Sequence, residues 1–316
     1  MAEPAKKSAL RKLLSELYNR TVAVGARLFL LNNGSLIRGN EKCNAYVYKR
    51  LQDDEPFMLM RLGVSEIRWF SLYDLKKYHP GRKPGPRDMV YDWPEDCLEE
   101  YGEVFSECYE NADAACVWYI SKIGEAEMLR KYAPRAARLD PGFLNVISAF
   151  EMKGPFWLKA LAGKKVLVVT PFDEAVKRQY ERRNEIYPEG FLPEFGELIV
   201  YKSVWFISKE KELHDPRFNT WFEALEKQRR DIEKLDFDIA LLGCGPFGAP
   251  LQVTIKKMGK KSVYLGGELQ LYFGIKGKRW DNDTSGIAKY YNDSWISLTE
   301  DTRPRGAERL DMNCYW

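Results

Sequence analysis

Histidine is nearly absent from this chain, and so are several other features that would indicate a specific chemistry. The 316 residues include only two histidines, His79 and His214, so acid–base chemistry would fall to carboxylates. The six cysteines form no C-x-x-C pair and no zinc-ligand spacing, which is typical of reduced thiols in a cytoplasmic protein. The longest apolar-leaning run, Val22 to Leu31, is interrupted by Gly25 and Arg27 and is too short for a membrane-spanning helix, which needs about 20 residues.

The net charge is also low, and the sequence contains no internal repeat. The 49 lysines and arginines stand against 46 aspartates and glutamates, which leaves a formal charge of +3 and excludes a strongly basic nucleic-acid binder. An aromatic content of 14% and the lack of any repeat exclude disorder, collagen and coiled coil. We expect a small appendage over residues 1–39 and one large domain over residues 40–316.

The N-terminal segment is basic and amphipathic. Its first 30 residues hold six basic and two acidic side chains, and four leucines, at positions 10, 13, 14 and 17, share one helical face. Two interpretations stay open for the predicted helix. It lies on an anionic membrane surface, or it packs on the body of its own or a neighbouring subunit.

The rest of the chain alternates short apolar runs with helical patterns, which is typical of an α/β fold. We predict a Rossmann-like, mostly parallel sheet flanked by helices. In such sheets ligands bind outside the carboxyl ends of the strands, so the loops that follow the strands are the candidate sites. The predicted strands cover residues 57–60, 115–120, 166–169, 198–207, 239–242 and 262–265.

The first candidate loop runs from Arg61 to Glu66. A charged Arg61 directly after a buried strand needs an anion or a carboxylate partner, so it is a candidate phosphate clamp. Gly63 and Ser65 are candidate ligand contacts at the start of the next helix, and Glu66 is a carboxylate close to them. The alternative is an internal Arg61–Glu66 ion pair without a ligand.

The second candidate loop is Thr170-Pro-Phe-Asp173. Asp173 is expected to cap the following helix, a role that alone would explain an acid there. Thr170 and Phe172 remain candidate ligand contacts.

The third candidate loop, Gly243-Cys-Gly-Pro-Phe-Gly248, fits the pattern G-x-G-x-x-G between a strand and a helix. Glycines there allow a phosphate to approach a helix N-terminus, so Gly243, Gly245 and Pro246 are candidate nucleotide contacts. A cofactor enzyme that uses NAD or S-adenosylmethionine is one interpretation. Against it, the next strand ends in two glycines instead of the acid that would hold a ribose.

The fourth candidate loop follows residue 265 and is rich in glycines and cations. This composition suits a segment that closes over phosphate, although a solvated basic loop has the same composition. Asp281 is a candidate oxygen ligand for a divalent cation. The candidate binding residues of this loop are Gly266, Gly267, Gln270, Lys276, Lys278 and Arg279.

The first, third and fourth loops together resemble the GT-D type of bacterial glycosyltransferase and its relatives encoded among surface-polysaccharide genes. In that family a first strand leads into an R-x-G-D-G-E type turn, which corresponds here to Arg61-Leu-Gly-Val-Ser-Glu66. A later glycine-rich turn and a second strand followed by glycines correspond to residues 243–248 and 265–270. The similarity covers residues 40–316.

The resemblance implies a Rossmann-like domain that transfers a sugar from a nucleoside diphosphate sugar to a glycan. In the family an Asp-x-Glu pair interacts with the metal ion, Mn²⁺ or Mg²⁺, and with the sugar donor. Val64 stands at the Asp position, so only Glu66 carries over, as a metal ligand beside Asp281 or as the base that deprotonates the acceptor. Arg61 and the cations of the fourth loop would stabilise the departing diphosphate.

We therefore predict a cytoplasmic glycosyltransferase of surface polysaccharide biosynthesis, with a glycan or lipid-linked glycan acceptor. The basic N-terminal segment would bring it to the inner face of the membrane. A non-catalytic nucleotide-sugar or glycan binding protein is the second hypothesis, because the missing Asp can mark lost chemistry. The cofactor enzyme is the third.

Overall fold

The computed structural model describes residues 36–78, 97–118, 125–187, 190–205, 215–281, 286–299 and 315. The predicted N-terminal helix and both histidines lie outside these residues.

An eight-stranded sheet forms the centre of the molecule, in the order β1-β4-β3-β2-β8-β7-β5-β6. Every pairing within it is parallel, which confirms the predicted Rossmann-like α/β fold. A short parallel pair, β9 with β10, stands apart. The strands are β1 (Leu36–Ile37), β2 (Phe57–Met60), β3 (Ala114–Cys116), β4 (Ala137–Leu139), β5 (Lys165–Thr170), β6 (Glu197–Lys202), β7 (Ile239–Leu242), β8 (Lys261–Tyr264), β9 (Ile275–Lys276) and β10 (Ile296–Ser297).

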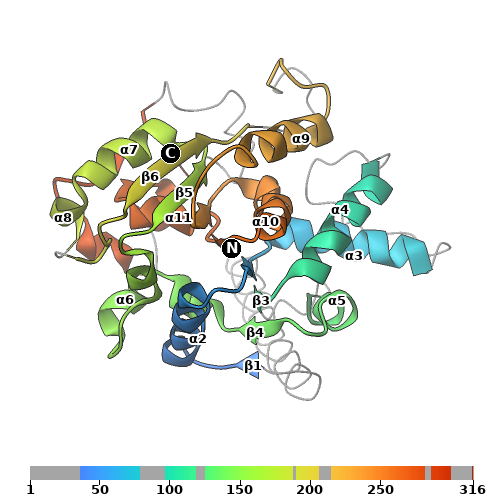
Figure 1. Ribbon diagram of the computed structural model, residues 1–316, viewed down its shortest axis with the longest axis horizontal. Helices are drawn as coiled ribbons and strands as arrows, with labels where there is room; N and C mark the ends of the chain where they lie inside the picture. Colours follow the sequence, from blue (N-terminus) through green and yellow to red (C-terminus); the bar gives the residue numbers. More distant parts are fainter. Residues whose placement is uncertain are drawn as a thin grey trace, which may run out of the picture.

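Helices cover both faces of this sheet. Figure 1 shows α2, α6 and α7 on one side and α4, α9 and α10 on the other. The α-helices are α2 (Asn40–Gln52), α3 (Val64–Tyr78), α4 (Leu98–Asn111), α5 (Glu125–Tyr132), α6 (Ser148–Glu151), α7 (Asp173–Glu181), α8 (Arg183–Ile186), α9 (Trp221–Ile232), α10 (Gly248–Lys257), α11 (Glu268–Tyr272) and α12 (Lys278–Asp281). The 3₁₀ turns are η3 (Pro141–Leu144), η4 (Trp157–Leu161), η6 (Gly245–Phe247) and η7 (Ile287–Tyr290).

The core lies in two layers, one on each face of the sheet. Along β5, Val166 and Val168 belong to one layer, and Leu167 and Val169 to the other. All four side chains are fully buried, as expected for parallel strands that are covered on both faces. This burial explains why β5 reads as an uninterrupted apolar run.

None of the described helices is long and apolar enough to cross a membrane.

The strand order places the four candidate loops side by side. They follow β2, β8, β7 and β5, which are consecutive neighbours in the sheet. Since the strands are parallel, their carboxyl ends share one edge. Moreover, β5 leads outward to β6 whereas its neighbour β7 leads inward to β8. Such a reversal is the point at which open α/β sheets bind their ligands.

Candidate functional site

Arg61 lies at the carboxyl end of β2 and is held by two contacts. Its Nη1 donates a hydrogen bond to the carbonyl of Leu265, 2.8 Å away at the end of β8. Its guanidinium carbon lies 4.4 Å from the ring centroid of Trp118, a distance at which cation–π attraction is substantial. Among the described residues, its buried Nε has no hydrogen-bond partner. Arg61 is therefore fixed in place and keeps an unused donor.

Trp118 forms the platform under Arg61 and is itself fixed. Its indole Nε1 donates to the carbonyl of Leu62 at 3.1 Å. Its backbone N–H donates to both carboxylate oxygens of Glu125, each at 3.1 Å, and Glu125 is only 3% exposed. The sequence interpretation missed Trp118 because it extended this strand to residue 120, whereas β3 ends at Cys116. With the strand end placed at Cys116, examination of the residues that follow each strand would have identified Trp118.

A second guanidinium, that of Arg279, lies against the glycine that follows the one contacted by Arg61. A Cβ built on Gly266 would lie 2.1 Å from Nη1 of Arg61, and a Cβ built on Gly267 would lie 3.4 Å from Nη1 of Arg279. The two guanidinium groups thus rest on consecutive glycines at the end of β8. Gly266 also has a φ of +58°, which favours glycine. Two cations at this edge of the sheet favour an anionic ligand such as a phosphate.

Glu66 lies in the first turn of α3 and is 8% exposed. A Cβ on Gly63 would lie 2.4 Å from its Oε2, so the carboxylate folds back over the helix N-terminus. Ser65 is half-buried in the same turn. The contact that the structure gives Arg61 is with the Leu265 carbonyl, and the alternative of an Arg61–Glu66 ion pair gains no support from the described residues.

Tyr264, at the end of β8, lies between these charges and the third loop. Burial raises the pKa of its hydroxyl well above the usual value, the negative charge of Glu66 raises the pKa further, and Arg61 opposes this effect. The hydroxyl donates to the carbonyl of Gly245 at 2.6 Å. A Cβ on Gly248 would lie 2.5 Å from the Tyr264 ring. Tyr264 therefore holds the glycine-rich turn against the arginine pair.

The glycines of the third loop serve different purposes. A Cβ on Gly243 would lie 2.6 Å from Cδ2 of Leu269, so packing alone requires that glycine. Gly245 has a φ of +57°, is exposed, and would meet nothing within 4 Å. Pro246 beside it is half-buried. Gly245 is thus the position where a ligand can approach the backbone. Cys244 is buried, and burial raises the pKa of its thiol, which disfavours the reactive thiolate.

The second loop is largely structural. Thr170 is 2% exposed, and its Oγ1 accepts a hydrogen bond from the backbone N–H of Phe172 at 3.3 Å. Phe172 is 8% exposed and belongs to the core. The predicted capping role of Asp173 is wrong: the N-cap is Phe172, α7 begins at Asp173, and the carboxylate pairs with Lys202 at 3.3 Å. The negative charge of Asp173 in the first turn still stabilises α7 through its interaction with the helix dipole.

The fourth loop is divided between structural and exposed residues. Gln270 is 3% exposed, and its Nε2 donates to the carbonyls of Ile275 and Lys276 at 3.3 and 3.0 Å. The ammonium of Lys276 lies 5.2 Å from the ring centroid of Tyr291. Lys278, Arg279 and Asp281 are exposed on α12. Of the three predicted cations, Arg279 lies against Gly267 at the end of β8.

The expected metal ligands do not form a recognisable metal site. In the described part of the chain, no group of three or more His, Cys, Asp and Glu side chains is placed to hold a metal ion. The oxygen-rich set that Mn²⁺ or Mg²⁺ requires would have to come from Glu66, Asp281 and a bound ligand together.

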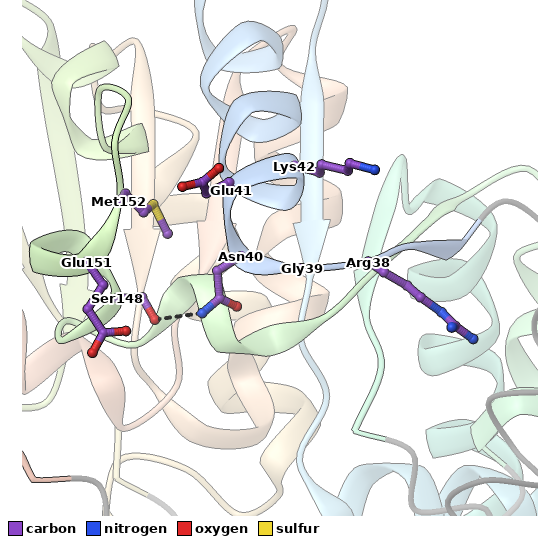
Figure 2. A pocket seen from close by; sticks show the side chains of 8 residues that line it. All are labelled: Arg38, Gly39, Asn40, Glu41, Lys42, Ser148, Glu151 and Met152. Carbon is purple, nitrogen blue, oxygen red and sulfur yellow. Dashed lines mark hydrogen bonds between the residues drawn. The ribbon is translucent and has the colours of Figure 1, made fainter.

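A hollow of about 400 Å³ lies elsewhere, at the N-terminus of α2 (Figure 2). Asn40 donates from Nδ2 to Oγ of Ser148 at 3.1 Å on its floor, and Arg38 and Lys42 point away from that pair. α2 follows β1, at the far end of the sheet from β5 and β6. None of the predicted site residues lines this hollow, whose lining is Arg38, Gly39, Asn40, Glu41, Lys42, Ser148, Glu151 and Met152.

Comparison of the chain with protein-family models, with curated proteins and with solved structures finds no match.

Proposed function

We propose that this chain is a glycosyltransferase that transfers a sugar from a nucleoside diphosphate sugar to a glycan or lipid-linked glycan acceptor in surface polysaccharide biosynthesis. The observation that carries the proposal is the arginine pair: Arg61 and Arg279 rest on the consecutive glycines Gly266 and Gly267 at the carboxyl end of β8. When the sugar leaves, negative charge develops on the diphosphate. Cations that are already in place stabilise that charge without reorganisation.

The surroundings of the pair suit this reaction. The Leu265 carbonyl and the Trp118 ring fix Arg61 before any ligand binds. Gly245 offers open backbone in the turn that follows the neighbouring strand β7. In the proposal the diphosphate therefore lies between the arginine pair and the turn that contains Gly245.

Glu66 is the proposed base. It would accept the proton of the acceptor hydroxyl as that oxygen attacks the sugar. In the proposal the two arginines stabilise the negative charge of the leaving group. In the same proposal the basic segment 1–39 brings the enzyme to the inner face of the membrane, near a lipid-linked acceptor.

A thermal-shift panel tests the donor site. Nucleoside diphosphates and their sugars, with and without Mn²⁺, are added to wild type, Arg61→Ala and Arg183→Ala. Arg183 is a matched control because it too stacks on an aromatic ring, that of Tyr180 at 4.9 Å, and donates to a carbonyl. At about 100 times the dissociation constant a ligand stabilises the folded state by roughly 2.7 kcal/mol. We expect this stabilisation in wild type and Arg183→Ala and its loss in Arg61→Ala.

Other outcomes of the panel would contradict the proposal. Equal stabilisation of Arg61→Ala would remove the arginine pair from the binding site. Stabilisation by NAD or S-adenosylmethionine alone would favour a cofactor enzyme built on the Gly243–Gly248 turn. Binding of a nucleotide sugar without transfer or hydrolysis would favour a non-catalytic binding protein.

Glu66→Gln tests the catalytic step. The amide keeps the size of the side chain but cannot accept the proton, so we expect unchanged donor binding and a loss of sugar transfer of at least about 100-fold. Donor consumption is measured together with the unfolding midpoint, which should stay close to that of wild type. Full transfer activity would exclude Glu66 as the base.

A further inference from the structure

Tyr315, near the C-terminus, lies against the fourth loop. A Cβ on Gly267 would lie 2.7 Å from Cε1 of its ring, so the ring packs directly on that glycine. Its backbone carbonyl accepts a hydrogen bond from Nε2 of Gln270 at 3.4 Å. Two residues that the sequence assigns to ligand binding, Gly267 and Gln270, therefore also hold Tyr315 in place.

The same ring contacts the second arginine of the pair. The guanidinium carbon of Arg279 lies 4.9 Å from the ring centroid of Tyr315 and 5.8 Å from that of Trp280. The two rings are 6.5 Å apart and inclined at 58°. An exposed arginine has high rotamer entropy, and contact with two aromatic rings restricts it. The restriction holds Nη1 of Arg279 beside Gly267, the residue after the glycine that Nη1 of Arg61 contacts.

We propose that Tyr315 is a positioning residue of the anion site: it holds Arg279 over Gly267, so that the pair of guanidinium groups binds a diphosphate. The inference rests on the proposed function and adds to it a residue that is distant in sequence from the other binding residues. The contact with Arg279 is made by the ring of Tyr315. Phenylalanine should therefore replace it and alanine should not.

A double-mutant cycle with inorganic pyrophosphate tests the inference. We expect Tyr315→Phe to bind within about twofold of wild type, and Tyr315→Ala and Arg279→Ala each to bind roughly tenfold more weakly. If Tyr315 acts through Arg279, the double variant Tyr315→Ala/Arg279→Ala binds no more weakly than Arg279→Ala alone. Unfolding midpoints of the four variants check that each one folds.

The alternative results separate this inference from the proposed function. Unchanged affinity in Tyr315→Ala, or additive losses in the cycle, would overturn the positioning role while leaving an Arg61-dependent site. Tighter binding in Tyr315→Ala would show instead that the ring blocks Gly267, and it too would overturn the inference. Absence of pyrophosphate and nucleotide binding in wild type would overturn both proposals.

Discussion

At the scale of single residues, the glycines show how one sequence pattern can have two causes. Gly243 and Gly248 lie where a Cβ would collide with Leu269 and with Tyr264, respectively. Gly245, between them, has open space and a positive φ. The G-x-G-x-x-G spacing therefore reflects packing at its two ends and a positive φ beside open space at its middle. A sequence pattern cannot separate these causes, because the colliding side chains come from β8 and α11.

Gly248→Ala tests the packing cause. The added Cβ would lie 2.5 Å from the buried Tyr264 ring, and overpacking of this kind costs roughly 1–3 kcal/mol. Gly154→Ala is the control, because a Cβ there meets nothing within 4 Å, and we expect a change within about 0.5 kcal/mol. Urea unfolding measures both. Equal stability of the two variants would show that Tyr264 moves aside without cost.

At the scale of elements, α9 shows how local signals compete. Asp215 and Pro216 predict a helix start, because the two residue types form a cap and a first turn. The helix begins instead at Trp221, after the N-cap Thr220. Thr220 accepts from the backbone N–H of Glu223 at 3.1 Å, and Glu223 accepts from that of Asn219 at 2.9 Å. The pattern T-x-x-E is that of a capping box, although Glu223 accepts from Asn219 and not from the N-cap residue itself. It competes with the Asp-Pro signal five residues earlier.

Thr220→Ala tests the contribution of this capping box. Loss of the hydroxyl leaves a backbone N–H of the first turn without its partner, which costs about 1 kcal/mol of folding stability. Thr220→Ser keeps the oxygen and should stay within about 0.5 kcal/mol of wild type. Chemical unfolding followed by circular dichroism gives both values. An unchanged midpoint in Thr220→Ala would mean that water replaces the cap.

Strand prediction succeeded where burial is two-sided and failed where strands are short. The predicted bounds of β2 and β7 are correct to the residue, because uninterrupted apolar runs mark strands that are covered on both faces. β4 was missed. It has three residues, and its middle one is Arg138, which is 1% exposed. A buried charged residue contradicts the apolar pattern on which the prediction depends.

At the scale of the whole molecule, the site depends on strand order. Each candidate loop is a local feature and was found from sequence. That Arg61 reaches the carbonyl of Leu265, 204 residues later, follows from the pairing of β2 with β8, which no local pattern encodes. The contacts of Trp118 and Tyr315 are equally non-local. Sequence therefore predicts which loops are candidates, and tertiary structure decides which of their side chains meet.

The pKa values of the buried tyrosines predict how the folding stability of the whole molecule changes at alkaline pH. Burial, as the largest cause, holds the pKa of several hydroxyls well above the usual value of 10.0, namely those of Tyr101, Tyr109, Tyr187, Tyr264 and Tyr272. Above about pH 10 the unfolded chain loses these protons while the folded chain retains them. The folded state then binds more protons, so its stability falls as pH rises.

The expected slope is roughly 1.4 kcal/mol per pH unit for each such tyrosine, beginning near the unfolded pKa. Urea unfolding between about pH 8 and 11 measures it, and ultraviolet absorbance of the folded protein follows tyrosine ionisation. Tyr109→Phe removes one buried hydroxyl and keeps the ring that stacks on Phe70 at 4.7 Å. This variant should therefore lower the slope of stability against pH by the contribution of one tyrosine, roughly 1.4 kcal/mol per pH unit. A slope that is equal in Tyr109→Phe and wild type would show that Tyr109 ionises in the folded state as readily as in the unfolded chain.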